Sequence, residues 1–269
     1  MTRGIGRGGT ARYAAAMRGT FVPLAVALIL AGCSRASSIR VATDAVFPPF
    51  HYVDDTGSLA GFDIELAREA LERAGMQVRF ERAESYAALF EGLQGGRYDV
   101  VAATTGITPQ RLERFGFTRP YFVTCLAVLV RAGPGEPRSP ADLVGRRVAA
   151  SAGTTSASAA HRIESAIVVE TARWRDSLAA LRAGDVDAVI IDEFEAVPFA
   201  RDADDLDVLP DPAATESYGL VLRRDNVDLR RRLDAAIDAM EADGTLAELR
   251  EQFGLNRPAD WPVRGPESQ

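Results

Sequence analysis

Apolar residues in the first half of the chain follow two patterns, short continuous runs and runs with a spacing of three to four residues. A continuous run is typical of a buried strand, and the longer spacing predicts the apolar face of a helix. The predicted elements are a strand over 39–43, a helix over 61–75, a strand over 78–80, a helix over 86–93 and a strand over 98–103. The order βαβαβ predicts an α/β domain.

The loop after the last of these strands is a candidate ligand site. Thr108 and Pro109 are typical of a helix start, so the helix that carries Arg111 begins there. The loop over 104–107 therefore lies at the carboxyl end of a strand. Ligands of open α/β sheets bind at that end.

The alternation restarts in the second half of the chain. A long strand over 121–131 leads to the glycines and prolines of 133–137, which mark a boundary. The later predicted elements are a strand over 147–151, a helix over 154–163, a strand over 167–171, a helix over 177–182, strands over 186–191 and 218–222, and helices over 229–240 and 246–253. Two α/β units predict two lobes, and the cleft between lobes is a common small-molecule site.

The N-terminal residues have the pattern of an export signal. Arginines up to Arg18 precede an apolar run over 21–31, and this run is shorter than the roughly 18 residues that a membrane span needs. Residues 28–33, Leu-Ile-Leu-Ala-Gly-Cys, resemble the bacterial lipobox. The resemblance implies a lipoprotein signal peptide over 1–32, lipid attachment at Cys33 and an anchor linker over 33–38. The alternative is ordinary signal cleavage with Cys33 as an unmodified thiol.

Charge and composition narrow the function classes. Removal of residues 1–32, which hold four arginines and no acidic residue, moves the formal charge from -7 to -11. An acidic surface argues against a nucleic-acid partner. The sequence has no lysine, which excludes a P-loop, a Schiff base and a lysine general base.

Cysteine and histidine are too sparse for a disulfide framework or a zinc site. Cys125 lies in an apolar run and is predicted to be a small buried residue. His51 and His161 have no cysteine or histidine neighbours at ligand spacing. We therefore expect no metal and no cofactor.

Several sequence blocks resemble the family 3 extracellular solute-binding proteins. They are "IRVATDAVFPPFHYVDDTGSLAGFDIELAREAL", "GRYDVVAATTGITPQR", "FTRPYF", "GRRVAASAGTTS", "LRAGDVDAVIIDE" and "ESYGLVLRRDN". The resemblance implies a two-lobed periplasmic-binding-protein-like fold of type II, with an interlobe cleft and a two-strand hinge. The implied parts are lobe one over 39–130 and 214–256 and lobe two over 131–213. The tail over 257–269 is rich in proline, and we predict that it is frayed.

The resemblance also implies a function. An exported receptor of this family binds a small solute, here a polar amino acid, by hinge closure and delivers it to an ABC importer. The implied partners are this ligand and the ABC permease, with membrane contact through the lipid anchor only. We expect a monomer that is lipid-anchored to the cell membrane or in the periplasm, and no enzyme activity.

The family's ligand-binding positions fall on identifiable residues. Arg111 matches the arginine that holds the ligand carboxylate, and a guanidinium can do so through two parallel hydrogen bonds. Thr155 matches a threonine that bonds the same carboxylate, and Gly153 and Thr154 precede it at a helix start. Without the resemblance, the sequence would predict only that Arg111 is a surface residue on a helix and that residues 153–155 form a turn.

Asp192 matches the aspartate that pairs with the ligand ammonium, although an aspartate there also suits a helix N-cap. Phe47 and Tyr86 match aromatic walls of the pocket, but either could belong to the core. Asp44 is a weaker candidate for ligand contact or for orienting its loop.

One position departs from the family pattern. Many relatives have serine or threonine where this chain has Gly106, so one hydroxyl contact is missing. Thr104 or Thr105 could compensate. An unpaired buried charge weakens binding, so this departure leaves open whether the ligand is a standard α-amino acid.

Two other functions remain open at this point. Cyclohexadienyl and arogenate dehydratases use the same fold, and Glu195 lies near the position expected for their acidic catalytic residue. The chain lacks a lysine for the cationic partner, which argues against this alternative. A ligand-sensing module that reports to a separate membrane kinase is the second alternative.

Overall fold

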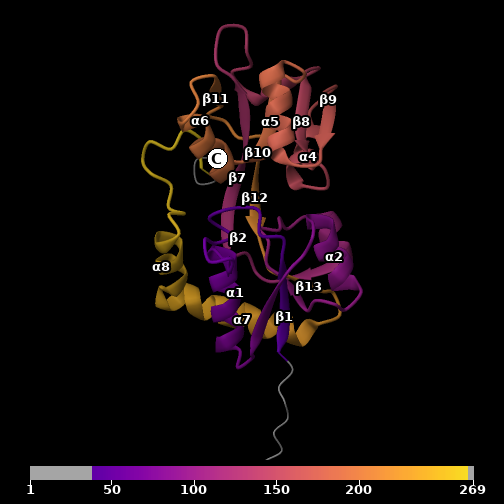
Figure 1. Ribbon diagram of the computed structural model, residues 1–269, viewed down its shortest axis with the longest axis vertical. Helices are drawn as coiled ribbons and strands as arrows, with labels where there is room; N and C mark the ends of the chain where they lie inside the picture. The colour runs from indigo at the N-terminus through magenta and orange to yellow at the C-terminus, as the bar shows by residue number, and fades with distance from the viewer. Residues whose placement is uncertain (1–37, 266–269) are drawn as a thin grey trace, which may run out of the picture. The chain divides into compact units, whose positions relative to one another are not determined.

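The computed structural model describes residues 38–265, and these residues form two sheets, each covered by helices (Figure 1). The predicted export signal, Cys33 and the linker up to Ser37 lie outside the described residues. Among the described residues, no helix is long and apolar enough to cross a membrane.

The first sheet has the strand order β4-β1-β5-β13-β6. Its core strands β1 and β5 run parallel, as the βαβαβ pattern predicts, and β13 is antiparallel to β5. The strands are β1 (Ile39–Thr43), β4 (Val78–Arg82), β5 (Val100–Val101), β6 (Phe115–Phe117) and β13 (Val221–Arg223). The helices that accompany it are α1 (Phe62–Arg73), α2 (Tyr86–Gln94), α3 (Pro109–Arg114), α7 (Val227–Asp243) and α8 (Thr245–Gln252).

The second sheet has the order β11-β7-β10-β8-β9, and β12 also pairs with β7. Its strands are β7 (Phe122–Arg131), β8 (Arg147–Ser151), β9 (Ile167–Thr171), β10 (Ala188–Asp192), β11 (Leu206–Val208) and β12 (Ala214–Tyr218). Its helices are α4 (Thr155–His161), α5 (Trp174–Ala183) and α6 (Glu193–Arg201), with a 3₁₀ turn over Pro140–Leu143. A separate hairpin joins β2 (Tyr52–Val53) to β3 (Leu59–Ala60).

The chain changes sheets earlier than we predicted. β7, which we placed at the end of lobe one, pairs with β10, β11 and β12 in the second sheet. The single strand predicted over 218–222 is two strands, because β12 pairs in the second sheet and β13 in the first. An apolar run predicts a buried strand but carries no information about its partner strand.

The two connections between the sheets lie side by side. Thr118 N donates to Leu220 O at 3.0 Å, and Tyr121 N donates to Tyr218 O at 3.0 Å. The hydroxyl of Thr118 accepts a third bond from Leu220 N at 3.0 Å. The predicted two-strand hinge is thus present, and its strands hold each other in register.

A third connection runs from α8 to the second sheet, through the C-terminal crossing segment (residues 254–265; Figure 1). We predicted a frayed tail there, but the side chain of Val263 is 3% exposed within the core of lobe two. Trp261 packs against Phe194 with ring centroids 5.3 Å apart, and Arg264 N donates to Pro210 O at 2.8 Å. Proline content misled the prediction, because a few apolar anchors order this segment.

Candidate functional site

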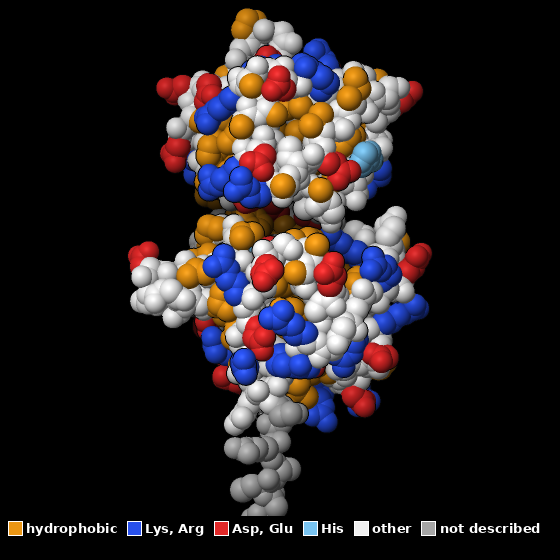
Figure 2. Space-filling model, turned by 45° about the vertical axis from the view of Figure 1, so that its right-hand side comes forward, with side chains coloured by type: hydrophobic (Ala, Val, Ile, Leu, Met, Phe, Trp, Pro, Cys, Tyr) orange, Lys and Arg blue, Asp and Glu red, His pale blue; other side chains and the backbone are white. Residues whose placement is uncertain are grey.

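The candidate site lies where the loop over 104–107 of lobe one meets lobe two. Ile107 N donates to Ser217 O at 2.8 Å, and Gly106 forms an isolated bridge with Tyr218 on β12. The loop follows β5, so it lies at the carboxyl end of the first sheet as predicted. Figure 2 shows a groove at the junction between the lobes, with apolar side chains along its edges.

Arg111 reaches from lobe one to lobe two. Thr108 caps α3 by accepting from the backbone nitrogen of Arg111 at 3.2 Å, which fixes the start of the helix that carries this arginine. The guanidinium donates to Gly106 O at 2.9 Å and to Gly153 O, in lobe two, at 3.2 Å. Both partners are neutral carbonyl groups, so the positive charge of Arg111 remains available to an anion.

Gly106 has no side chain, and the space beside it is occupied by Glu216, a residue that we did not predict to belong to the site. A Cβ atom at this position would lie 2.5 Å from Oε2 of Glu216 and 2.8 Å from Cγ2 of Thr155. The missing hydroxyl at position 106 therefore has a steric reason, because Glu216 occupies the space. The structure brings Gly106, Arg111, Thr155 and Glu216 together.

Glu216 is a functional candidate that the sequence reasoning missed. It lies on β12, two residues before Tyr218 and therefore on the same face of the strand. Burial raises the pKa of its carboxyl group, while the hydroxyl of Thr155 and the charge of Arg111 oppose that rise. The block "ESYG" contained the signal, but nothing in it indicated where the side chain would point.

Thr154 and Thr155 have different roles at the start of α4. Thr154 is the N-cap, and its hydroxyl accepts from Ala157 N at 3.2 Å and donates to Ser151 O at 2.6 Å. Its hydroxyl thus serves the helix start. Thr155 is the first helical residue, and its side chain faces Gly106 across the junction.

Asp192 has the helix-capping role that we considered as the alternative to ligand binding. Its Oδ1 atom accepts from Phe194 N at 2.7 Å, and Oδ2 accepts from the hydroxyls of Thr124, at 2.9 Å, and Tyr218. None of these donors carries a positive charge. Burial raises the pKa of Asp192 to about 7, and the negative charge of Glu216 adds to the rise. A ligand cation would favour its charged form.

Glu193, the neighbour of Asp192, is completely buried and fully paired. It accepts from Cys125 N at 2.8 Å and from the indole of Trp261 at 2.7 Å, and it forms an ion pair with Arg257. Thr124 connects the two acids, because its hydroxyl also lies 3.1 Å from Glu193. Glu193 therefore ties β7 and α6 to the C-terminal crossing segment.

Asp44, which follows β1, lies against His51. Asp44 Oδ1 is 3.3 Å from His51 Nδ1 without forming a hydrogen bond. Burial lowers the pKa of His51 to about 3, so this imidazole is neutral, and burial raises the pKa of Asp44 to about 6. We had considered His51 only as a metal ligand.

Thr104 belongs to the same corner of lobe one. Its hydroxyl lies 3.1 Å from His51 Nε2, and its backbone N donates to Asp63 Oδ2 at 2.6 Å. The backbone of Thr104 has a φ of 39°, an uncommon value for a residue with a side chain, and the contact with Asp63 holds it there. Asp63 is itself buried, which raises its pKa to about 7.

The two aromatic candidates have different surroundings. Phe47 is 8% exposed and packs on Phe50, with ring centroids 5.0 Å apart, inside the largest apolar cluster. Tyr86 begins α2 at the junction, and the guanidinium of Arg111 lies 5.7 Å from its ring centre. Tyr86 is therefore better placed than Phe47 to form a wall of the site.

Glu195, the residue on which the dehydratase alternative depends, lies in the first turn of α6 and is half-buried. Burial raises the pKa of its carboxyl group to about 8, with a further rise from the charges of Asp192 and Asp44. The carboxylate of Glu195 thus lies close enough to Asp192 and Asp44 for their charges to raise its pKa.

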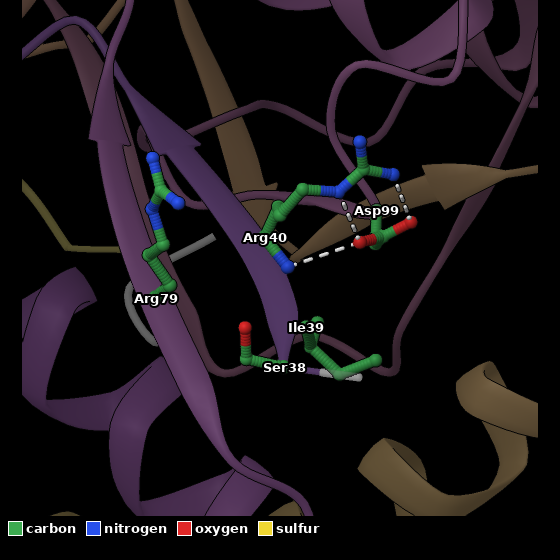
Figure 3. A pocket seen from close by; sticks show the side chains of 5 residues that line it. All are labelled: Ser38, Ile39, Arg40, Arg79 and Asp99. Atoms are coloured by element: carbon green, nitrogen blue, oxygen red, sulfur yellow. Dashed lines mark hydrogen bonds and ion pairs between the residues drawn. The ribbon is translucent and has the colours of Figure 1, made fainter. Parts of the chain in front are cut away.

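A surface hollow elsewhere in lobe one does not share this chemistry. It lies at the amino end of β1 and is lined by Ser38, Ile39, Arg40, Arg79 and Asp99 (Figure 3). Arg40 donates to both oxygens of Asp99 at 3.0 Å, so the charges are already paired. Within residues 38–265, no group of three or more histidine, cysteine or acidic residues is arranged to hold a metal ion.

Comparison with known proteins supports a binding role. The chain is 27% identical over 223 residues to the L-cystine-binding protein TcyJ of Escherichia coli, covering 80% of this chain and 82% of that protein. It is 30% identical over 253 residues to the probable ABC transporter arginine-binding protein ArtJ of Chlamydia trachomatis, covering 88% of this chain and 95% of that protein. These relatives are transport binding proteins rather than enzymes.

The fold comparison agrees. A crystal structure of a mutant of ArgBP from T. maritima matches with a TM-score of 0.72 at 28% identity, covering 83% of this chain and 97% of that one. This match confirms the predicted two-lobed α/β fold. The model of the bacterial extracellular solute-binding proteins, family 3, matches residues 39–256, and the chain belongs to that family.

Proposed function

We propose that this protein is an extracytoplasmic receptor that binds an amino acid between its lobes and presents it to an ABC importer. The observation that carries the proposal is the position of Arg111, whose guanidinium spans the junction beside Thr155 and, among residues 38–265, has no acidic partner at ion-pair distance. An α-carboxylate is the ligand group that this arginine suits.

Asp192 would hold the α-ammonium at the other side of the site. Its present donors are an amide and two hydroxyls, and a carboxylate has lone pairs for further donors. Tyr86 would cover the ligand from lobe one, and Asp44 and Thr104 would line the same lobe. Gly106 and Thr154 would contribute backbone groups. Closure of the lobes would then complete the set of contacts.

The test is calorimetric titration of residues 35–269 with the twenty amino acids, prephenate and arogenate. We expect one amino acid, or a few of related shape, to bind, and Arg111→Ala to lower the affinity by at least about 30-fold, since losing one partner of a buried charge pair costs about 2–5 kcal/mol. Arg232→Ala, an exposed position on α7, is the matched control and should bind like the wild type. Binding that survives Arg111→Ala unchanged would contradict the proposal.

We also propose that the mature chain is a monomer anchored through a lipid on Cys33. The support is the lipobox-like sequence before this cysteine. A lipid anchor there would keep the receptor at the membrane, near its permease. In cells, the wild type should fractionate with membranes and Cys33→Ala should not. Equal fractionation of the two proteins would remove the anchor from the proposal.

A further inference from the structure

Unsatisfied buried polar atoms are concentrated at the candidate site. Among residues 38–265, the buried side-chain atoms without a hydrogen-bond partner are Asp44 Oδ1, His51 Nδ1 and Glu216 Oε2. Buried polar groups in folded proteins are nearly always paired, so such exceptions need an explanation. Two of the three atoms are carboxylate oxygens, which can be satisfied only by donors or cations.

The position of Glu216 gives this observation its meaning. Its carboxylate fills the place where a side chain at position 106 would lie, beside Arg111 and Thr155. A serine or threonine hydroxyl there could donate to a ligand, whereas an ionised glutamate can only accept. The exchange reverses the hydrogen-bonding character of this corner and offsets the positive charge of Arg111.

The remaining charges have the same sign. The charges of Asp192 and Asp44 raise the pKa of Glu195, and the charges of Glu216 and Glu193 raise the pKa of Asp192. Neutral His51 cannot supply the missing positive charge. Arg82 acts on Asp44 and Arg175 acts on Glu195, but both arginines are exposed to solvent. An amino acid with a neutral side chain would leave these acidic groups without a cationic partner.

We propose that Glu216 is a specificity-determining residue and that the site selects an amino acid with a cationic side chain over neutral ones of the same shape. This inference rests on the proposed function and adds the class of the ligand. Asp44, the second unsatisfied carboxylate, contributes to the same selection from lobe one.

The test compares L-arginine with L-citrulline, which has the same length and shape but a neutral ureido group. Calorimetry on the wild type should give an affinity for arginine, or for lysine, at least about 100-fold above that for citrulline. Glu216→Gln keeps the size of the side chain, and we expect it to reduce this ratio by about tenfold or more, equivalent to about 1.4 kcal/mol. Glu72→Gln, an exposed position on α1, should leave the ratio unchanged.

Asp44→Asn provides a second measurement in case Glu216→Gln does not fold, which thermal unfolding would reveal. It should also lower the ratio. A wild type that binds citrulline or another neutral amino acid as well as it binds arginine and lysine would overturn the inference and leave the proposed function standing. An unchanged ratio in both variants would do the same.

Agmatine, which is arginine without its carboxylate, separates the two proposals. If agmatine binds, no amino acid does, and Glu216→Gln weakens agmatine binding, then the amino-acid receptor is wrong and the selection of cations by Glu216 holds. If neither agmatine nor any amino acid binds, both proposals are wrong.

Discussion

Two glutamates near the junction, Glu193 and Glu216, have opposite surroundings. Glu193 meets an arginine, an indole, a backbone amide and a hydroxyl, whereas Glu216 keeps an oxygen without a partner. A buried carboxylate with a complete set of donors holds the fold together. A buried carboxylate with an incomplete set leaves an interaction for a ligand to make.

Asp192 stands between these two cases. Its donors, a backbone amide and two hydroxyls, are all neutral, so its hydrogen bonds are satisfied while its charge is not. If the comparison is correct, mutation of Glu193 should affect stability most, mutation of Glu216 should affect ligand choice most, and Asp192 should affect both.

The largest expected effect is on Glu193. Glu193→Ala leaves Arg257 without its buried partner and removes the acceptor of Trp261 and Cys125 N. Breaking such a buried pair costs about 3–5 kcal/mol, so urea unfolding should show a loss of this size. Glu72→Ala, at an exposed position on α1, is the control. A loss below about 1 kcal/mol, in the range of surface pairs, would mean that the C-terminal crossing segment does not depend on this contact.

Asp192→Asn should have a smaller effect on stability. The amide keeps one acceptor for the cap of α6 but places an NH₂ group opposite the hydroxyls of Thr124 and Tyr218. An unsatisfied or mismatched buried donor costs about 1–3 kcal/mol, measurable by urea unfolding without ligand. The same variant should lose most of its affinity for the amino acid. Full affinity together with lower stability would reduce Asp192 to a helix cap.

Asp44→Asn should make the ligand-free protein more stable at high pH. The pKa of Asp44 is about 6 in the folded chain, above its ordinary value of 3.8, so the folded state binds more protons between these values. Its contribution to the free energy of unfolding therefore falls as pH rises from about 4 to about 6 and then stays low. The variant removes this fall.

We expect the free energy of unfolding of Asp44→Asn, relative to that of the wild type, to be higher at pH 8 than at pH 4 by an amount on the order of 1 kcal/mol. Urea unfolding at both pH values measures it. The groups around Asp44 that share its field are His51, Arg82, Asp63 and Glu195. Equal wild-type and variant stability at both pH values would show that Asp44 is already satisfied in solution.

The smallest expected effect on stability is that of Glu216→Gln. Removal of the charge relieves burial of an ionised group, whereas the new amide lacks an acceptor, and these two effects oppose each other. We expect a change below about 0.5 kcal/mol in urea unfolding, despite the large change in ligand preference. A loss above about 2 kcal/mol would place Glu216 with Glu193 as a residue of the fold.

Local pattern predicted the regular elements well and the contacts between them poorly. The strands over 39–43, 147–151 and 167–171 occur with the predicted bounds, because apolar runs bounded by polar and turn residues depend on near neighbours. The separation of β12 from β13 could not be predicted in the same way. It depends on which sheet each strand joins, and Gly219 and Leu220 have no feature that reveals it.

The site shows the same limit. The sequence placed the loop over 104–107 at a strand end, and the structure adds that Arg111 and Thr155 meet there. The contact between Gly106 and Glu216 joins residues more than a hundred positions apart, so no local pattern contains it. The missing hydroxyl was visible in the sequence, but the carboxylate that replaces it was not.

Because of the C-terminal crossing segment, the two ends of the described chain lie on different lobes. Residue 38 lies at the start of the first sheet, and residue 265 lies on the second lobe (Figure 1). Fluorophores attached at these two residues would therefore lie on different lobes. Their energy transfer would follow hinge motion directly, so the receptor could serve as an optical sensor for its solute without a probe inside the fold.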